Sequence, residues 1–418
     1  MSGSSSPLAI TDFRRFWIAA LVSNTGTWMQ NAAIPYAVFE LTGRSGAIGV
    51  TGLFQYLPFM LMGAVGGTLA DRFPRRRLLM VTQSAMLVSA LALWALVASG
   101  AATVVSITAL AFVFGLLGGI TTPAWQAFVV ELVPRDQLLG AVTLNSTQFN
   151  AARAVGPFLG GIVIAAFGVQ TAFLVNALSF LAVIAVLVVI RSAGGSRPRR
   201  ADGLAETGVI SGLVEAARHI RHSPPILACC IAIVAVAGLG SPLFNFLPVY
   251  GEEEFMVTGW RLGLLFGAGG IGSLIFAPAL LVLAPRVPRA RLLASAMALY
   301  GLGIIGVGLS TAYAAAVAGL MVFGAAYLGI ASTMNTTIQL VVPDHLRGKV
   351  IALYLMCLTG ALPLGLLVWG LVSEWIGLRP TTVAAGTLLL VATGVLRATG
   401  RFALMAAADD ARDAARLP

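Results

Sequence analysis

Twelve long apolar runs, separated by short polar turns, constrain this chain more than any other feature. A helix needs about 20 mostly apolar residues to cross a bilayer. Only 10% of the residues are charged and 58% are hydrophobic, whereas a soluble domain carries about 25% charged residues. We therefore predict an all-α membrane protein with twelve transmembrane helices. The predicted spans are 14–40, 46–70, 78–99, 103–130, 138–168, 170–191, 225–250, 258–284, 290–311, 313–341, 347–376 and 379–400.

A short basic turn occurs at equivalent positions of the two halves. Residues 70–79 align with residues 284–293, and seven of the ten positions are identical. Such a repeat indicates two copies of one membrane unit. The longest charged, Gly/Ser/Pro-containing stretch lies at mid-chain, and part of it (204–222) is a candidate amphipathic surface helix. We predict two pseudo-symmetric six-helix bundles at 1–191 and 225–400, a cytoplasmic central loop at 192–224 and a cytoplasmic tail at 401–418.

The arginines and lysines determine the orientation. Of these 26 residues, 22 fall on the side of the predicted membrane that holds both termini, three fall on the other side, and Arg153 lies inside a span. Cytoplasmic loops carry an excess of Lys and Arg. Both termini are therefore predicted to be cytoplasmic.

Several other classes of function receive no support from the sequence. The net charge of +10 resides in short loops between apolar spans, which favours a membrane surface over nucleic acid as its partner. The three cysteines lie in apolar runs as packing residues, and the three histidines show no metal-ligand spacing. We expect no metal and no cofactor. The spans contain no nucleophile–base pair and no paired carboxylates, so we do not expect an enzyme, and the chain has no phosphate-binding loop for ATP.

The turn after the second span carries a family signature. The pattern Gly67-x-x-x-Asp71-Arg72-x-x-Arg75-Arg76 resembles the loop signature of the major facilitator superfamily of secondary transporters, with Pro74 where a glycine is usual. Residues 24–30, 131–136, 144–146 and 342–348 resemble the subgroup that contains enterobactin exporters and macrolide efflux proteins. The resemblance covers both halves. It implies the major facilitator fold, a location in the bacterial inner membrane and a monomer.

In similar transporters, the aspartate of this signature faces the start of span 11 and closes a cytoplasmic gate. The resemblance therefore implies that Asp71 faces residues 346–349 and that the signature residues form a gating motif. The alternative is that the arginines only determine topology. The gating candidates are Gly67, Asp71, Arg72, Arg75 and Arg76.

A second pattern lies in span 5. Ala152-x-x-x-Gly156-Pro157-x-x-Gly160-Gly161 resembles a motif associated with antiporters of this superfamily, with Ala152 in place of its first glycine. Proline bends a helix, and glycine allows close helix packing. We expect close packing against another span, namely span 8. An ordinary packing kink is the alternative.

Polar residues within the spans predict a central cavity. Arg153 lies about 22 Å along span 5, where a charge is costly and should face the bundle interior or water. Amides should also point inward, because lipid would leave them unpaired. Each of these residues could instead satisfy a contact between helices. A moderately large organic molecule with an anionic or hydroxyl-rich part would suit this lining. The predicted substrate cavity comprises Asn24, Trp28, Asn31, Gln55, Asn145, Phe149, Arg153, Asn245, Asn335 and Gln339.

The resemblance implies exchange of the substrate for protons, but no Asp or Glu lies in the middle of a predicted span. Glu40 is the candidate coupling residue, with Asp71 and Asp136 as alternatives. We predict a secondary active exporter of a drug-like molecule or siderophore that works by alternating access. A lipid or lysophospholipid translocator of the same fold and a non-transporting membrane sensor remain alternatives.

Overall fold

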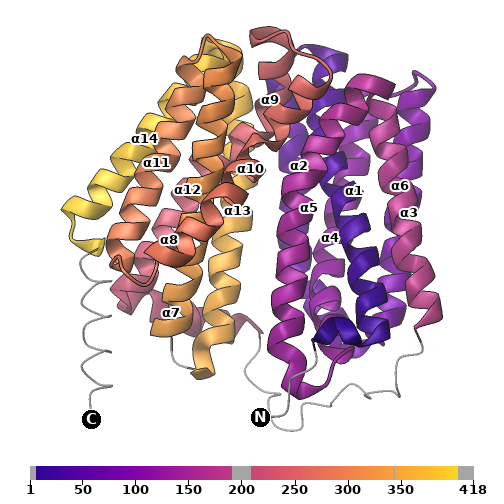
Figure 1. The fold of residues 1–418 in the computed structure, drawn as a ribbon, viewed down its shortest axis with the longest axis vertical. Coiled ribbons are helices and arrows are strands. Elements are labelled where there is room, and N and C mark those ends of the chain that lie inside the picture. The colour runs from indigo at the N-terminus through magenta and orange to yellow at the C-terminus, as the bar shows by residue number, and fades with distance from the viewer. Residues whose placement is uncertain (1–5, 191–208, 343, 403–418) are drawn as a thin grey trace. The chain divides into compact units, whose positions relative to one another are not determined.

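The computed structural model describes residues 6–190, 209–342 and 344–402, and its regular elements in these ranges are all helical (Figure 1). The parts of the predicted central loop at 192–208 and of the predicted tail at 403–418 lie outside the described residues. The first six long helices are α1 (Thr11–Thr42), α2 (Ser45–Arg72), α3 (Arg75–Ala98), α4 (Val104–Glu131), α5 (Leu138–Phe167) and α6 (Val169–Val189). The remaining α-helices, of which α9 has only three residues, are α7 (Val209–His222), α8 (Pro224–Ala235), α9 (Leu247–Val249), α10 (Trp260–Leu283), α11 (Arg289–Leu309), α12 (Tyr313–Val341), α13 (Asp344–Ile376) and α14 (Leu378–Ala398).

Within the described ranges, eleven helical segments are long and apolar enough to cross a membrane. The helix α1 is not among them by composition, although its 32 residues extend about 48 Å at 1.5 Å per residue. Its polar residues, including Asn24, Gln30 and Asn31, lower its average hydropathy. With α1, the helices agree with the twelve spans that the sequence predicts.

Span 7 changes its helical type along its length. The predicted span 225–250 is observed as Pro224–Glu254, in which α8 is followed by a π-helical segment (Val236–Gly240) and a 3₁₀ segment (Ser241–Phe246). Glycine and proline at 238, 240 and 242 weaken a regular helix at this point. The indole nitrogen of Trp369 donates a hydrogen bond to the carbonyl of Leu239 at 3.1 Å. Such a side-chain donor satisfies backbone that the break leaves exposed.

Contacts divide the described chain into two compact units. The first contains α1–α6 together with Pro248–Gly267. In it, α1 packs on α5 and α6, α2 packs on α4, and α3 packs on α4 and α6 (Figure 1). Aromatic residues fill one end of this bundle, where the Phe16 ring lies 4.6 Å from Trp125 and 5.1 Å from Phe128 between centroids.

The second unit contains the segment that ends at Leu247 and the chain from Ala268 onward. Here α11 packs on α12 and α14, while α13 packs on α7, α8 and the π-helical segment. The amphipathic helix predicted at 204–222 is observed as α7 from Val209, and residues 204–208 lie outside the described residues. Glu215 of α7 forms an ion pair with Lys349 of α13.

Candidate functional site

A stripe of α1 carries the polar side chains that the sequence predicts for a cavity. Asn24, Trp28 and Asn31 are half-buried and follow one another at helical spacing. Each contacts a different neighbouring side chain. The Asn24 amide donates to Gln148 Oε1 of α5 at 3.2 Å, and the Gln55 amide of α2 donates to Asn31 Oδ1 at 3.0 Å.

Trp28 lies between these two amide pairs and contacts the middle of α5. Its ring meets the ring of Phe149 edge to face, with centroids 5.9 Å apart and planes at 70°. The guanidinium carbon of Arg153 lies 5.3 Å from the centroid of the Trp28 ring. A cation at this distance is attracted to the π-face of the indole. The two aromatic rings and the arginine therefore form one continuous group.

This group presents an accessible face. Arg153 is exposed, and Phe149 retains 44% of its accessible surface. Tyr56 of α2 lies close enough to interact with the charge of Arg153. The face therefore offers a permanent positive charge, aromatic rings and amides to a molecule that approaches it.

A network of amides continues this face along α5. The indole nitrogen of Trp125 in α4 donates to Asn145 Oδ1 at 3.2 Å, and Gln148 Nε2 donates to the same oxygen at 3.4 Å. Because Gln148 also accepts from Asn24, a chain of hydrogen bonds joins α4, α5 and α1. The predicted set of cavity residues omits Trp125, Gln148 and Tyr56. The sequence signal that could have found them is a polar group that lies within one helical turn of a predicted cavity residue or at the same depth in the membrane.

Three predicted cavity residues belong to the second unit. Asn245 is buried in the 3₁₀ segment of span 7. Asn335 and Gln339 are exposed one turn apart on α12, and the Gln339 amide donates to Asn335 Oδ1 at 3.0 Å. The seven predicted residues of the first unit therefore fall into three contact groups: Asn24 with Asn145 through Gln148, Trp28 with Phe149 and Arg153, and Asn31 with Gln55. The other three predicted residues lie in the second unit.

The predicted gating motif lies at the α2–α3 turn, and two of its arginines bind within the first unit. Arg75 forms an ion pair with Glu131 at the end of α4. Arg76 donates to the carbonyls of Leu187 and Val188, which belong to the last turn of α6, where carbonyls lack partners within the helix. Both arginines therefore fasten the start of α3 to neighbouring helix ends.

Asp71 and Arg72, the other charged members of the motif, are exposed at the end of α2. An added side chain at Gly67 would meet nothing within 4 Å. Residues 346–349, which the family resemblance implies as the partner of Asp71, belong to the second unit. The gating contact stays a prediction.

The glycine–proline motif of α5 makes close helix contacts on two sides. A Cβ atom added to Gly156 would lie 2.6 Å from Trp28 Cβ and 2.7 Å from the Thr25 carbonyl oxygen. A Cβ atom on Gly161 would lie 2.4 Å from the Cα atom of Gly263 in α10. Real Cβ atoms essentially never approach other atoms so closely. Glycine is therefore required at these points for α5 to pack on α1 and on the first turns of span 8.

The remaining motif residues support these contacts. Gly160 faces the backbone of Met29, and Pro157 is buried inside α5. The contact of Gly156 with the backbone around Trp28 sets the spacing between α1 and α5. That spacing positions the indole of Trp28 relative to Arg153.

Glu40, the candidate coupling residue, lies near the last turn of α1. It is exposed, and the half-buried Glu252 and Tyr36 lie near it. The Tyr36 hydroxyl lies within hydrogen-bonding range of the Glu252 carboxylate. Two carboxyl groups and one phenol therefore gather at this end of the first unit.

A family model described as a transmembrane secretion effector of the MFS type matches residues 2–416. The chain belongs to this family. The multidrug efflux pump Tap of Mycobacterium tuberculosis is 28% identical over 390 residues, which cover 90% of each chain. The enterobactin exporter EntS of Salmonella typhi is 24% identical over 270 residues, 63% of this chain and 62% of that one. A crystal structure of a bacterial homologue of the lysosomal transporter Spinster, inward-facing and unoccupied, has a TM-score of 0.75 at 15% identity, with 94% of this chain and 97% of that chain covered.

Membership of this family makes the protein a multi-pass membrane transporter of the major facilitator fold. The structural likeness to the Spinster homologue supports the fold alone. Within that fold, the first unit carries an accessible face on which Arg153, Trp28 and Phe149 stand beside hydrogen-bonded amides. This arrangement can bind a molecule by charge, stacking and hydrogen bonding.

Proposed function

We propose that this transporter exports a moderately large, drug-like organic molecule or siderophore across the bacterial inner membrane by alternating access. One observation supports this most directly. Arg153 lies about 22 Å along α5, is exposed, and stacks over Trp28. An ionisable residue at such depth is a functional-site candidate by default. The similarity to Tap and EntS favours export over import.

Each part of the face has a proposed role in binding. Arg153 attracts an anionic or hydroxyl-rich part of the substrate, and Trp28 with Phe149 provides ring surfaces for its apolar part. Asn24, Asn31, Gln55 and Asn145 donate and accept hydrogen bonds. Asn245, Asn335 and Gln339 are proposed as substrate contacts of the second unit by itself. Because amides both donate and accept, they tolerate substrates with differently placed polar groups.

We further propose that proton exchange drives export. Glu40 is the proposed coupling residue, and Glu252 and Tyr36 lie near it. Asp71 and Arg72 form the proposed cytoplasmic gate, and the close packing of Gly156 and Gly161 limits leakage. Both termini are proposed to be cytoplasmic, with bundles at 1–191 and 225–400, and the protein is proposed to act as a monomer.

The test is efflux from loaded cells and movement into inside-out vesicles, with a panel of siderophores, macrolides and dyes. We expect efflux to fall when an uncoupler removes the proton gradient. Arg153→Ala should reduce it, while Arg153→Lys should retain part of it because the charge remains.

Arg261→Ala is the matched control. Arg261 lies 5.7 Å from the Trp260 ring in the first turn of α10, so it repeats the cation–π geometry outside the proposed site. If both variants lose efflux while the same amount of each protein is present in the membrane, the loss is a general structural effect. Absence of transport for every compound by well-folded protein would move support to a lipid translocator or a sensor.

A further inference from the structure

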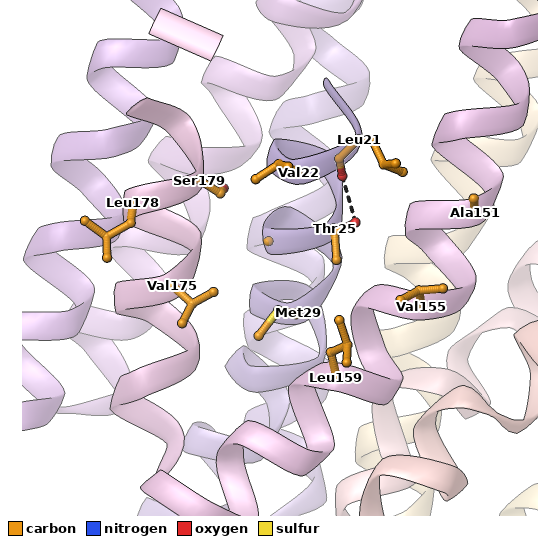
Figure 2. Close-up of a pocket in the computed structure, with 11 residues that line it drawn as sticks. Leu21, Val22, Thr25, Met29, Ala151, Val155, Leu159, Val175, Leu178 and Ser179 are labelled. Carbon is orange, nitrogen blue, oxygen red and sulfur yellow. Dashed lines mark hydrogen bonds between the residues drawn. The ribbon is translucent and has the colours of Figure 1, made fainter. Parts of the chain in front are cut away.

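An apolar groove of about 600 Å³ lies between α1, α5 and α6 in the first unit. Figure 2 shows α1 between the other two helices, with Val155 and Leu159 of α5 on one side and Val175 and Leu178 of α6 on the other. Its size falls within the range of small-molecule sites, which is about 300–1,000 Å³. The groove is separate from the polar face, because α5 turns Val155 to the groove and Arg153 to Trp28.

The groove is deep where α1 meets α6, because small residues at this contact let the two helices approach each other. A Cβ atom on Gly26 would lie 2.5 Å from Ser179 Oγ and 2.8 Å from Asn176 Oδ1. No larger residue fits at position 26 with this packing. The longer side chains on either side of this contact therefore stand above it as walls.

The polar atoms of the lining are already satisfied inside the protein. The Thr25 hydroxyl donates to the Leu21 carbonyl at 2.7 Å, drawn as a dashed line in Figure 2. The Ser179 hydroxyl donates to the Asn176 carbonyl at 2.7 Å. All other lining side chains are apolar or glycine. The hydroxyl hydrogens of the lining are therefore already used inside the protein, and the predominantly apolar lining favours hydrocarbon.

The depth of the groove places it in the hydrocarbon core of the membrane. At 1.5 Å per residue, Leu21 and Met29 lie about 15 and 27 Å from the start of α1. Val155 lies about 26 Å from the start of α5, and Leu178 lies about 17 Å from the end of α6. These helix ends lie on one side of the membrane, because α6 runs opposite to α1 and α5. A bilayer core is about 30 Å thick, so all three walls meet in its interior.

We propose that this groove is a binding site for one acyl chain of a membrane phospholipid. The walls remain accessible, with Leu178 at 53%, Val155 at 42% and Leu159 at 38% of their accessible surface. At this depth, hydrocarbon chains surround the protein. An acyl chain in the groove fills the space beside the α1–α5 contact and stabilises the positions of both helices.

Photo-crosslinking in liposomes tests this site. Purified full-length protein is reconstituted into phosphatidylcholine containing a small fraction of a phospholipid with a mid-chain diazirine, irradiated, and mapped by mass spectrometry. We expect adducts to concentrate on Val155, Leu159 and Leu178 relative to Val88 of α3, which is 64% exposed. Equal labelling of all lipid-exposed positions would mean that only the general lipid layer covers the groove, and would overturn the proposal.

Val155→Trp fills the groove, and Val88→Trp adds the same ring to an exposed position of α3. The first variant should lower labelling of Leu178 to the level of exposed positions elsewhere, and the second should leave it unchanged. Added phospholipid should also raise the melting temperature of delipidated wild type more than that of Val155→Trp, because a bound ligand stabilises the folded state.

Unchanged labelling and an equal lipid effect in Val155→Trp would contradict the proposal. If that variant does not fold, Leu159→Phe and Val175→Phe fill the groove from two different helices and are judged by the same criteria. This test is independent of the proposed export function, since it requires neither a substrate nor a proton gradient.

Discussion

The contact of Gly156 with α1 gives a prediction whose size follows from the structure. In Gly156→Ala, the new methyl carbon would lie 2.6 Å from Trp28 Cβ and 2.7 Å from the Thr25 carbonyl oxygen, whereas ordinary contacts begin at 3.4 Å. The helices must therefore separate by nearly 1 Å. Overpacking of this kind costs about 1–3 kcal/mol. We expect lower stability and, because Trp28 moves relative to Arg153, weaker transport.

Gly63→Ala is the matched control, because position 63 also lies inside a helix and an added Cβ there meets nothing within 4 Å. Alanine favours a helix over glycine by about 0.5–1 kcal/mol, so this variant should be neutral or more stable. Thermal unfolding of purified protein, followed by tryptophan fluorescence, measures both. If Gly156→Ala unfolds at the temperature of Gly63→Ala and transports equally well, the inferred α1–α5 packing is wrong.

Three further predictions concern single contacts. A double-mutant cycle that replaces Asn24 and Gln148 should give a coupling energy of about 0.6 kcal/mol, the average for hydrogen bonds between membrane helices; additive effects on unfolding would contradict their hydrogen bond. Asp71→Asn should reduce transport without reducing the amount of inserted protein, and full transport at equal membrane amounts would refute the proposed gate. Arg75→Ala should cost about 0–1 kcal/mol, typical of a solvent-accessible ion pair, and exchanging the charges of Arg75 and Glu131 should restore the loss; an exchange less stable than the single variant would exclude the pairing.

The helical spans were predictable because they depend on local composition. The length of each apolar run locates a helix. Basic turns such as Arg75–Arg77 mark the boundaries between consecutive helices. The helical period also predicts the stripe of Asn24, Trp28 and Asn31 on α1. These features require no knowledge of which helices pack together.

Contacts across helices were harder to predict. Trp125 and Gln148 join the network only because α4, α5 and α1 pack in a particular register, which no local pattern specifies. The break in span 7 was missed because residues 236–246 are mostly apolar, although Gly240 and Pro242 were a signal. The acyl-chain groove depends on the approach of α1 to α6 at Gly26, and its individual residues resemble any other lipid-facing surface.

Transport by purified protein in liposomes with an imposed pH gradient tests the central claim most directly. A compound found in the efflux panel is compared with a neutral analogue, using wild type, Arg153→Ala and Arg261→Ala. We expect gradient-driven transport that Arg153→Ala reduces, more strongly for the anionic compound. Arg261→Ala should leave transport near the wild-type rate. Equal transport by wild type and Arg153→Ala, or transport that ignores the pH gradient, would contradict the central claim.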